Sequence, residues 1–160
     1  MKDAIEFSQE ELTTMMEGLL AGATIGDVVN IGQDNIEAGY GLAYSLYSAG
    51  NYKDAETMFK ALCIYDHNDA RFWMGLGGCR QAGGDLPGAI DAYAYSSYAS
   101  ALGDPAPVVH GALCYMKLGD KENAVNLFKA AVEMGTPGNS EHAVFHTRAR
   151  AMLDMLEKGE

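Results

Sequence analysis

Apolar residues recur along the chain at the spacing of amphipathic helices, in segments separated by glycines and short polar turns. One skeleton occurs three times, 34 and then 35 residues apart: a glycine, an alanine five residues later and an aromatic residue four beyond that. Residues four apart lie on one face of a helix, one turn from each other. The three copies are Gly50, Ala55 and Phe59; Gly84, Ala89 and Tyr93; and Gly119, Ala124 and Phe128.

This skeleton predicts three pairs of antiparallel helices. The glycine ends the first helix of each pair, and Asn51, Asp85 or Asp120 directly after it caps the second. Small residues on both helices let the two backbones approach closely, because another small residue stands seven positions before each glycine. One pair cannot cover its own apolar face, so the pairs must stack into a superhelix with a concave and a convex side. The earlier small residues are Ala43, Gly77 and Ala112.

The period and the alternation of small and large residues resemble the tetratricopeptide repeat. We therefore expect an all-α solenoid of three helix hairpins in a single domain, with helices before and after it. Ser8 with Glu11, and Asp34 with Glu37, have the spacing of capping boxes, and Ser140 is expected to cap the last helix. The domain is 1–160, with N-terminal helices at 8–30, repeats at 36–69, 70–103 and 105–138, and a capping helix at 140–157.

The first predicted helix has an apolar stripe that needs a partner. Three partners could cover the stripe: the first repeat, a second copy of the chain, or another protein. Packing onto the repeat and self-association are both left open by the sequence. The candidate self-association residues are Leu12, Met15, Met16 and Leu19.

Tyrosines form a second stripe on the first helix of repeat one. Tyr40, Tyr44 and Tyr47 lie beside the hairpin-facing residues, on the side that a solenoid turns toward its concavity. Either the segment 24–30 covers them, or they form an aromatic patch of the kind that lines a binding groove. The same offsets in the later repeats extend the groove. The candidate groove residues are Tyr40, Tyr44, Tyr47, Arg71, Met74, Gln81, Val109, His110 and Leu113.

The net charge of the chain limits the classes of partner that it can bind. A net charge of −11 without a basic cluster argues against nucleic acid as a partner. Apolar runs are short, which argues against insertion into a membrane, and the first residues lack the basic and apolar regions of a secretory signal. We expect a cytoplasmic protein.

No catalytic, metal or cofactor site is expected. Three cysteines without a C-x-x-C pair are typical of buried small apolar residues. His142 and His146 are four apart but lack a complementary carboxylate or cysteine, which favours solvated or capping roles over metal binding. A hydrolase using Cys114 with His110 would lack an oxyanion feature and a residue to orient the histidine. The chain is therefore predicted not to be an enzyme.

Several segments together resemble a particular family of repeat proteins. The helix end at 19–28, the Tyr40 to Tyr47 helix, and the segments 59–67 and 74–81 look like the class II chaperones of bacterial type III secretion, which serve translocator proteins. The resemblance extends over about residues 10 to 157.

The resemblance implies a bacterial, cytoplasmic chaperone that binds type III translocators, usually two hydrophobic ones, and keeps them soluble and competent for export. In that family an extended Pro-x-Leu-x-x-Pro segment lies in the concave groove. Here the tyrosines would receive proline rings, while Arg71, Gln81 and His110 would bind backbone carbonyls. The alternative is a tetratricopeptide-repeat adaptor or scaffold for another peptide.

Overall fold

The computed structural model describes residues 8–159, which form nine helices and no strand, so the predicted all-α class is confirmed. The N-terminal residues before Ser8, which were part of the secretory-signal prediction, and residue 160 lie outside the described residues. The helices are α1 (Gln9–Leu20), α2 (Ile25–Val28), α3 (Gln33–Ser48), α4 (Tyr52–Tyr65), α5 (Ala70–Gly83), α6 (Leu86–Ala99), α7 (Pro105–Lys117), α8 (Lys121–Glu133) and α9 (Ser140–Lys158).

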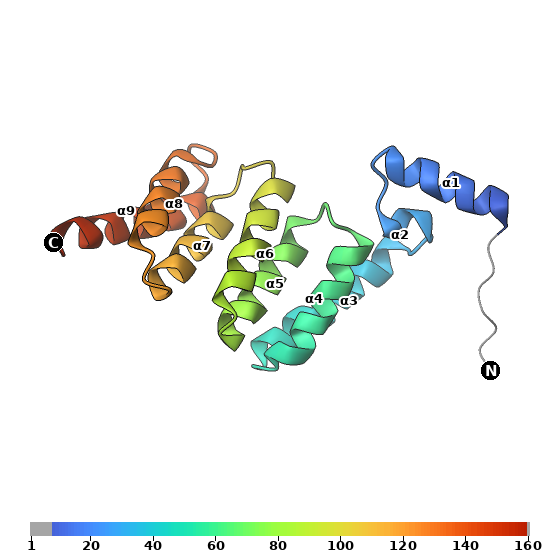
Figure 1. Ribbon diagram of the computed structural model, residues 1–160, viewed down its shortest axis with the longest axis horizontal. Coiled ribbons are helices and arrows are strands. Elements are labelled where there is room, and N and C mark those ends of the chain that lie inside the picture. The colour runs from blue at the N-terminus through green and yellow to red at the C-terminus, as the bar shows by residue number, and fades with distance from the viewer. Residues whose placement is uncertain (1–7, 160) are drawn as a thin grey trace.

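Helices α3 to α8 form three stacked hairpins, as predicted (Figure 1). Each of these helices packs on the next along the chain, and α9 packs on both α7 and α8. Helices α1 and α9 lie at opposite ends of the row (Figure 1). This is the tetratricopeptide-type solenoid that the repeated skeleton predicted.

The glycine turns inside the hairpins are as predicted, but Asn51 forms no side-chain cap on α4 and donates a hydrogen bond to Asp54 instead. Gly50, Gly84 and Gly119 have φ of +80°, +87° and +79°, a left-handed conformation that favours glycine. After two of these glycines, the carboxylates of Asp85 and Asp120 accept hydrogen bonds from the backbone N–H three residues on, which caps the second helix.

Two predicted helix starts are wrong. Gly32, rather than Asp34, is the N-cap of α3, and it forms no side-chain cap. Glu37, the expected partner of Asp34, instead binds an arginine of α5. At α9, Asn139 rather than Ser140 accepts the capping hydrogen bonds. The first difference arises because Glu37 has a charged partner in α5, and the second because Asn139, one residue earlier, provides a competing local side chain.

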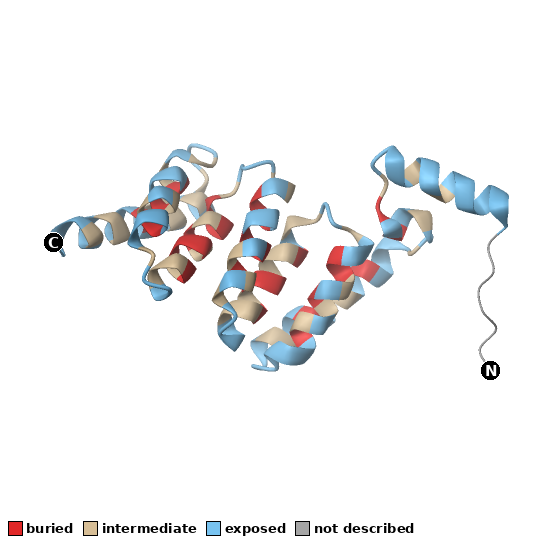
Figure 2. Ribbon diagram, viewed as in Figure 1, coloured by how far each residue is buried: buried red, intermediate tan, exposed pale blue. Residues whose placement is uncertain are grey.

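The small residues of the skeleton are buried where the helices meet. All five alanines among them are fully buried, and Gly77 is buried beside Tyr93. A Cβ atom on Gly77 would lie 2.6 Å from the Tyr93 ring, so glycine is needed for this close approach. Figure 2 shows the buried positions following the hairpins along the row. The alanines are Ala43, Ala55, Ala89, Ala112 and Ala124.

Helix α1 lies apart from the hairpins and is mostly exposed (Figure 2). It packs on α2 and contains no buried residue. Leu12, Met16 and Leu19 are exposed, and Met15 is half-buried. The apolar stripe of α1 is therefore not covered by the first repeat.

Candidate peptide-binding groove

A cavity of about 280 Å³ lies between α3 and α5 and reaches α7. Six of the nine predicted groove residues line it. The other four lining residues are Phe59, Gly75, Gly78 and Tyr93. We call this cavity the tyrosine groove. Its lining residues are Tyr40, Tyr44, Tyr47, Phe59, Arg71, Met74, Gly75, Gly78, Tyr93 and His110.

The tyrosines of α3 differ in how firmly they are held. Tyr40 is half-buried, with its ring centroid 6.2 Å from that of Phe59 and 5.8 Å from that of Phe72. Tyr44 is 58% exposed and lies 6.3 Å from Tyr40. Tyr40 is therefore partly a core residue, whereas the Tyr44 ring is free to meet a ligand.

Glycines of α5 make room for the aromatic rings of the groove. A Cβ atom on Gly78 would lie 3.2 Å from the Tyr47 ring, and one on Gly75 would overlap the Phe59 ring. Tyr47 also packs edge-on against Tyr52 at 5.4 Å. The groove is thus a slot between aromatic walls whose depth depends on the absence of side chains from one face of α5.

Segment 24–30, the alternative cover for the tyrosines, lies elsewhere. Helix α2 packs on α4 and α1. A Cβ atom on Gly26 would meet the Tyr65 carbonyl oxygen at 3.0 Å and the Ile36 side chain at 3.4 Å, which places α2 beside the end of α4 and the start of α3. The tyrosine groove is left open.

Arg71 is fixed at one end of the groove by two carboxylates. Its Nη2 lies 2.7 Å from Glu37 and 2.6 Å from Asp69, and its guanidinium carbon is 4.8 Å from the Tyr40 ring centroid. The hydrogen bonds that the Arg71 guanidinium donates to Asp69 and then to Glu37 raise the pKa of Arg71, and they lower the pKa of Glu37. Held in this way, the guanidinium presents a positioned donor at the groove.

The α7 end of the groove is formed by His110. Its ring stacks on Tyr93 at 5.4 Å, and the Tyr93 hydroxyl donates a 2.6 Å hydrogen bond to the Gln81 side-chain oxygen. Burial, and then the Arg148 guanidinium, lower the pKa of His110, which keeps the ring neutral at pH 7. Gln81 does not line the cavity; it positions Tyr93, which does.

Two candidate groove residues of repeat three, Val109 and Leu113, do not line the cavity. Val109 is fully buried in a core shared with Phe128 and Ala149, and Leu113 packs against that core. The reason is α9, which packs on α7 and covers the face that corresponds to Met74 in repeat two. The sequence offsets treat the repeats as equivalent, whereas only the last repeat has a terminal helix against it.

Three lining residues were missed. Phe59 and Tyr93 were identified only as the aromatic members of the repeated skeleton, and Gly75 was not among the candidate groove residues. The rings reach the groove because the facing positions of α5 are glycines. The Gly-rich run at residues 75–78 was the available signal.

The other candidate chemistry is structural. Cys63, Cys79 and Cys114 are free and buried, as predicted. His142 Nδ1 accepts a hydrogen bond from the Thr136 N–H, and His146 Nε2 is 2.6 Å from the Met134 carbonyl oxygen. Residues 8–159 contain no cluster of three metal-ligating side chains. None of the helices described is long and apolar enough to cross a membrane.

Comparisons with known proteins identify relatives over nearly the whole chain. Tetratricopeptide-repeat families match residues 40–105 and 110–133. The chain is 35% identical over 150 residues to the low calcium response locus protein H of Yersinia pestis, covering 94% of this chain and 88% of that protein.

Solved structures are also similar to this chain over most of its length. A type III secretion complex from Aeromonas hydrophila superposes with a TM-score of 0.85 at 34% identity, covering 92% of this chain and 97% of that chain. The Yersinia enterocolitica type III secretion chaperone SycD, in complex with a peptide of the translocator YopD, gives 0.75 at 36% identity, with 81% and 98% covered. SycD as an alternative dimer gives 0.75 at 34%, with 81% and 96% covered. With this similarity along the sequence and throughout the solenoid, the chain belongs to the class II, translocator-specific chaperones of type III secretion.

Proposed function

We propose that this chain is a cytoplasmic secretion chaperone that holds an extended segment of a type III translocator in the tyrosine groove. The observation that carries the proposal is the open aromatic slot beside Tyr44, in a chain whose relative SycD has been solved with a translocator peptide. An extended peptide presents side chains and unpaired backbone groups together, and the groove offers aromatic faces with a few polar groups.

The lining chemistry indicates how such a segment is held. Tyr44 and Tyr47 present flat faces to proline rings, which suits a ligand that is already extended and loses little entropy on binding. Arg71 is positioned to donate to backbone carbonyls, and the neutral His110 has one ring nitrogen to contribute. Met74 has a flexible side chain that can adapt to different apolar residues, in keeping with service to two hydrophobic translocators.

Binding of this kind suits secretion because it is strong enough to protect the translocator from aggregation and weak enough for the chaperone to be removed before export. Translocator segments destined for a membrane would aggregate if left exposed. Ordering an unfolded segment on binding costs free energy, which limits affinity and suits later removal of the chaperone. The net charge of −11 favours solubility of the loaded complex.

We expect Tyr44→Ala to weaken binding of a Pro-x-Leu-x-x-Pro peptide by about tenfold, since it removes an exposed aromatic wall. Its melting temperature should stay close to that of the parent, because Tyr44 is 58% exposed. Isothermal titration calorimetry measures the affinity. Tyr65→Ala, an exposed tyrosine of α4 outside the groove, is the matched control. Equal losses of affinity in both variants would contradict the proposal.

The adaptor alternative makes a different prediction in cells. A translocator chaperone should increase the soluble yield of hydrophobic translocators encoded in the same operon and co-purify with them. If none becomes more soluble and none co-purifies, the groove serves another peptide.

We also infer that the chain is not an enzyme. Its relative SycD is a chaperone. The hydrolase alternative would need a reactive thiol, but Cys114 is fully buried and burial raises its pKa. A protonated, inaccessible thiol is a poor nucleophile.

We propose that the exposed stripe of α1 mediates self-association. Leu12 and Met16 are 47% and 63% exposed, and SycD has been solved as a dimer. The double variant Leu12→Glu/Met16→Glu should sediment as a monomer at concentrations where the parent is a dimer, because it places charges in an apolar contact. Thr13→Glu on the same helix is the control. An unchanged mass of the double variant would exclude this surface.

A further inference from the structure

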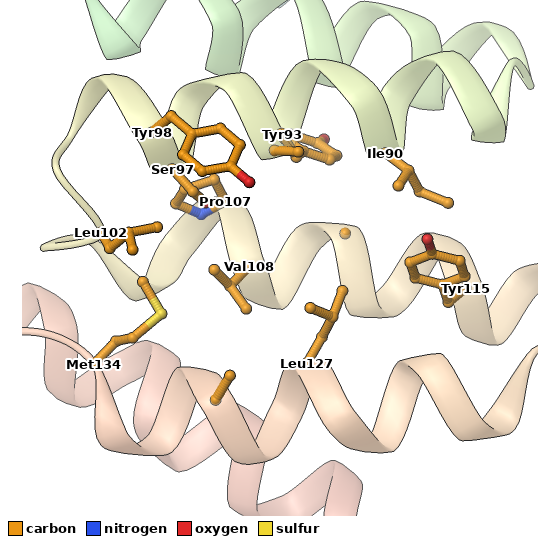
Figure 3. A pocket seen from close by; sticks show the side chains of 13 residues that line it. Ile90, Tyr93, Ser97, Tyr98, Leu102, Pro107, Val108, Tyr115, Leu127 and Met134 are labelled. Atoms are coloured by element: carbon orange, nitrogen blue, oxygen red, sulfur yellow. The ribbon is translucent and has the colours of Figure 1, made fainter.

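A larger cavity than the tyrosine groove lies further along the row of helices. This cavity of about 510 Å³ lies between α6 and α8, with α7 as its floor. Figure 3 shows Tyr98, Leu102 and Met134 gathered at one end of it, and Tyr115 at the other. No charged residue lines it. We call it the α6–α8 groove.

The equivalent position in the preceding repeat is filled by the chain itself. There Trp73 of α5 stacks on Tyr95 of α6, with ring centroids 4.7 Å apart. The residues 35 positions later are Val108 and Ala130, both of which line the α6–α8 groove. A large aromatic pair is thus replaced by two small side chains, which leaves a hollow.

Charge has been removed together with volume. In the preceding repeat, Arg80 lies 3.4 Å from Glu56 of α4 and donates a hydrogen bond to the Gly88 carbonyl of α6, so it bridges the two helices. The equivalent residues beside α7 are Tyr115 and Ile90, which line the α6–α8 groove. In a chain of net charge −11, this hollow is an uncharged, apolar site.

The rim of the groove shows that it is open to a partner. Tyr98 is 73% exposed and Leu102 is 54% exposed. Exposing large apolar side chains around an apolar hollow is unfavourable unless something covers them. The groove also lies next to the proposed binding site, because the buried Tyr93 ring forms a wall of both cavities.

The chemistry of the lining selects the occupant. An extended peptide would leave backbone N–H and C=O groups unpaired in a groove lined almost entirely by apolar atoms, whereas a helix satisfies them internally. A helix laid between α6 and α8 over α7 would also match the geometry of helix packing and of helix-in-groove recognition.

We infer that the α6–α8 groove binds an uncharged, apolar helix of the same translocator whose extended segment occupies the tyrosine groove. This inference rests on the proposed function. One chaperone would then cover two parts of one polypeptide, a short unfolded motif at the tyrosines and a membrane-destined helix on the neighbouring face.

Photocrosslinking of the full chain, co-expressed with the full-length translocators of its operon, tests the inference. Benzoylphenylalanine in place of Tyr98 should crosslink to an apolar helical segment of a translocator, and in place of Tyr44 to the extended motif. Crosslinking at Tyr44 but not at Tyr98, or crosslinks at Tyr98 only between chaperone copies, would overturn the inference and leave the proposed function standing. Failure at both positions would overturn both.

A pair of matched variants gives a second readout. Tyr98→Asp places a charge at the rim and should lower the yield of soluble co-expressed translocator by about tenfold, while peptide affinity in the tyrosine groove stays unchanged. Ile64→Asp, at the equivalent exposed position beside the filled hollow, should have little effect. The refilled variant Val108→Trp/Ala130→Tyr should act like Tyr98→Asp. Equal translocator yields from all three variants and the parent would contradict the inference.

Discussion

Replacing Gly75 with alanine should destabilise the chain by about 3 kcal/mol, at the upper end of the range for overpacked cores. A Cβ atom at this position would overlap three atoms of the Phe59 ring. Phe59 is 1% exposed and lies in the core of the first hairpin, so its ring has little room to move. Urea denaturation should show a lower midpoint with an unchanged slope.

The matched control for this prediction is Gly41→Ala on α3. A Cβ atom at Gly41 would meet no other atom within 4 Å, so this variant should be stabilised by about 0.5–1 kcal/mol through helix propensity. The variant Gly75→Ala/Phe59→Leu should recover part of the loss, since the smaller side chain leaves space for the new methyl group. If Gly75→Ala is as stable as the parent, α5 does not approach α4 as closely as described.

Replacing Gly78 with leucine should weaken binding of a translocator peptide by roughly a hundredfold, or about 3 kcal/mol. Gly78 lines the tyrosine groove, and a Cβ atom there would lie 3.2 Å from the Tyr47 ring. A leucine side chain would extend from this point into a cavity of about 280 Å³ and occupy the space that the ligand needs. Calorimetric titration with the peptide measures the loss.

Two variants separate blocking from unfolding. Gly78→Ala adds one methyl group at a distance that a small shift of Tyr47 relieves, so it should bind within a few-fold of the parent. Gly83→Leu lies on the same helix with no atom within 4 Å of the added Cβ atom, and it should bind normally. Normal binding by a folded Gly78→Leu variant would show that the ligand does not enter the tyrosine groove.

The repeated skeleton was sufficient to predict the solenoid. Gly50, Gly84 and Gly119 required left-handed turns, and the buried alanines required close helix contacts, so local chemistry and packing agreed. The errors fell where tertiary contacts compete with local ones. Glu37 has the spacing of a capping residue, yet Arg71 of α5 provides a stronger, charged partner.

The site was predictable on the side of α3 and less so elsewhere. Tyr44 and His110 follow from the register of the helices. Val109 was misplaced because the position of α9 is not encoded in the repeat period. The α6–α8 groove was missed because it is defined by small residues where the preceding repeat has Trp73 and Tyr95; comparing repeats for lost volume, as well as shared pattern, would have revealed it.

The glycines of α5 also affect how the molecule folds. Four glycines within fourteen residues make α5 less stable as an isolated helix, by roughly 2–4 kcal/mol in total relative to alanines at the same positions. This helix therefore depends on α4 and α6, which pack against it on both sides, and it cannot nucleate alone. Because α5 is stable only when it is packed on α4 and α6, the hairpins on either side of it are coupled in stability. The amide hydrogens of α5 should therefore exchange only when a flanking helix also opens.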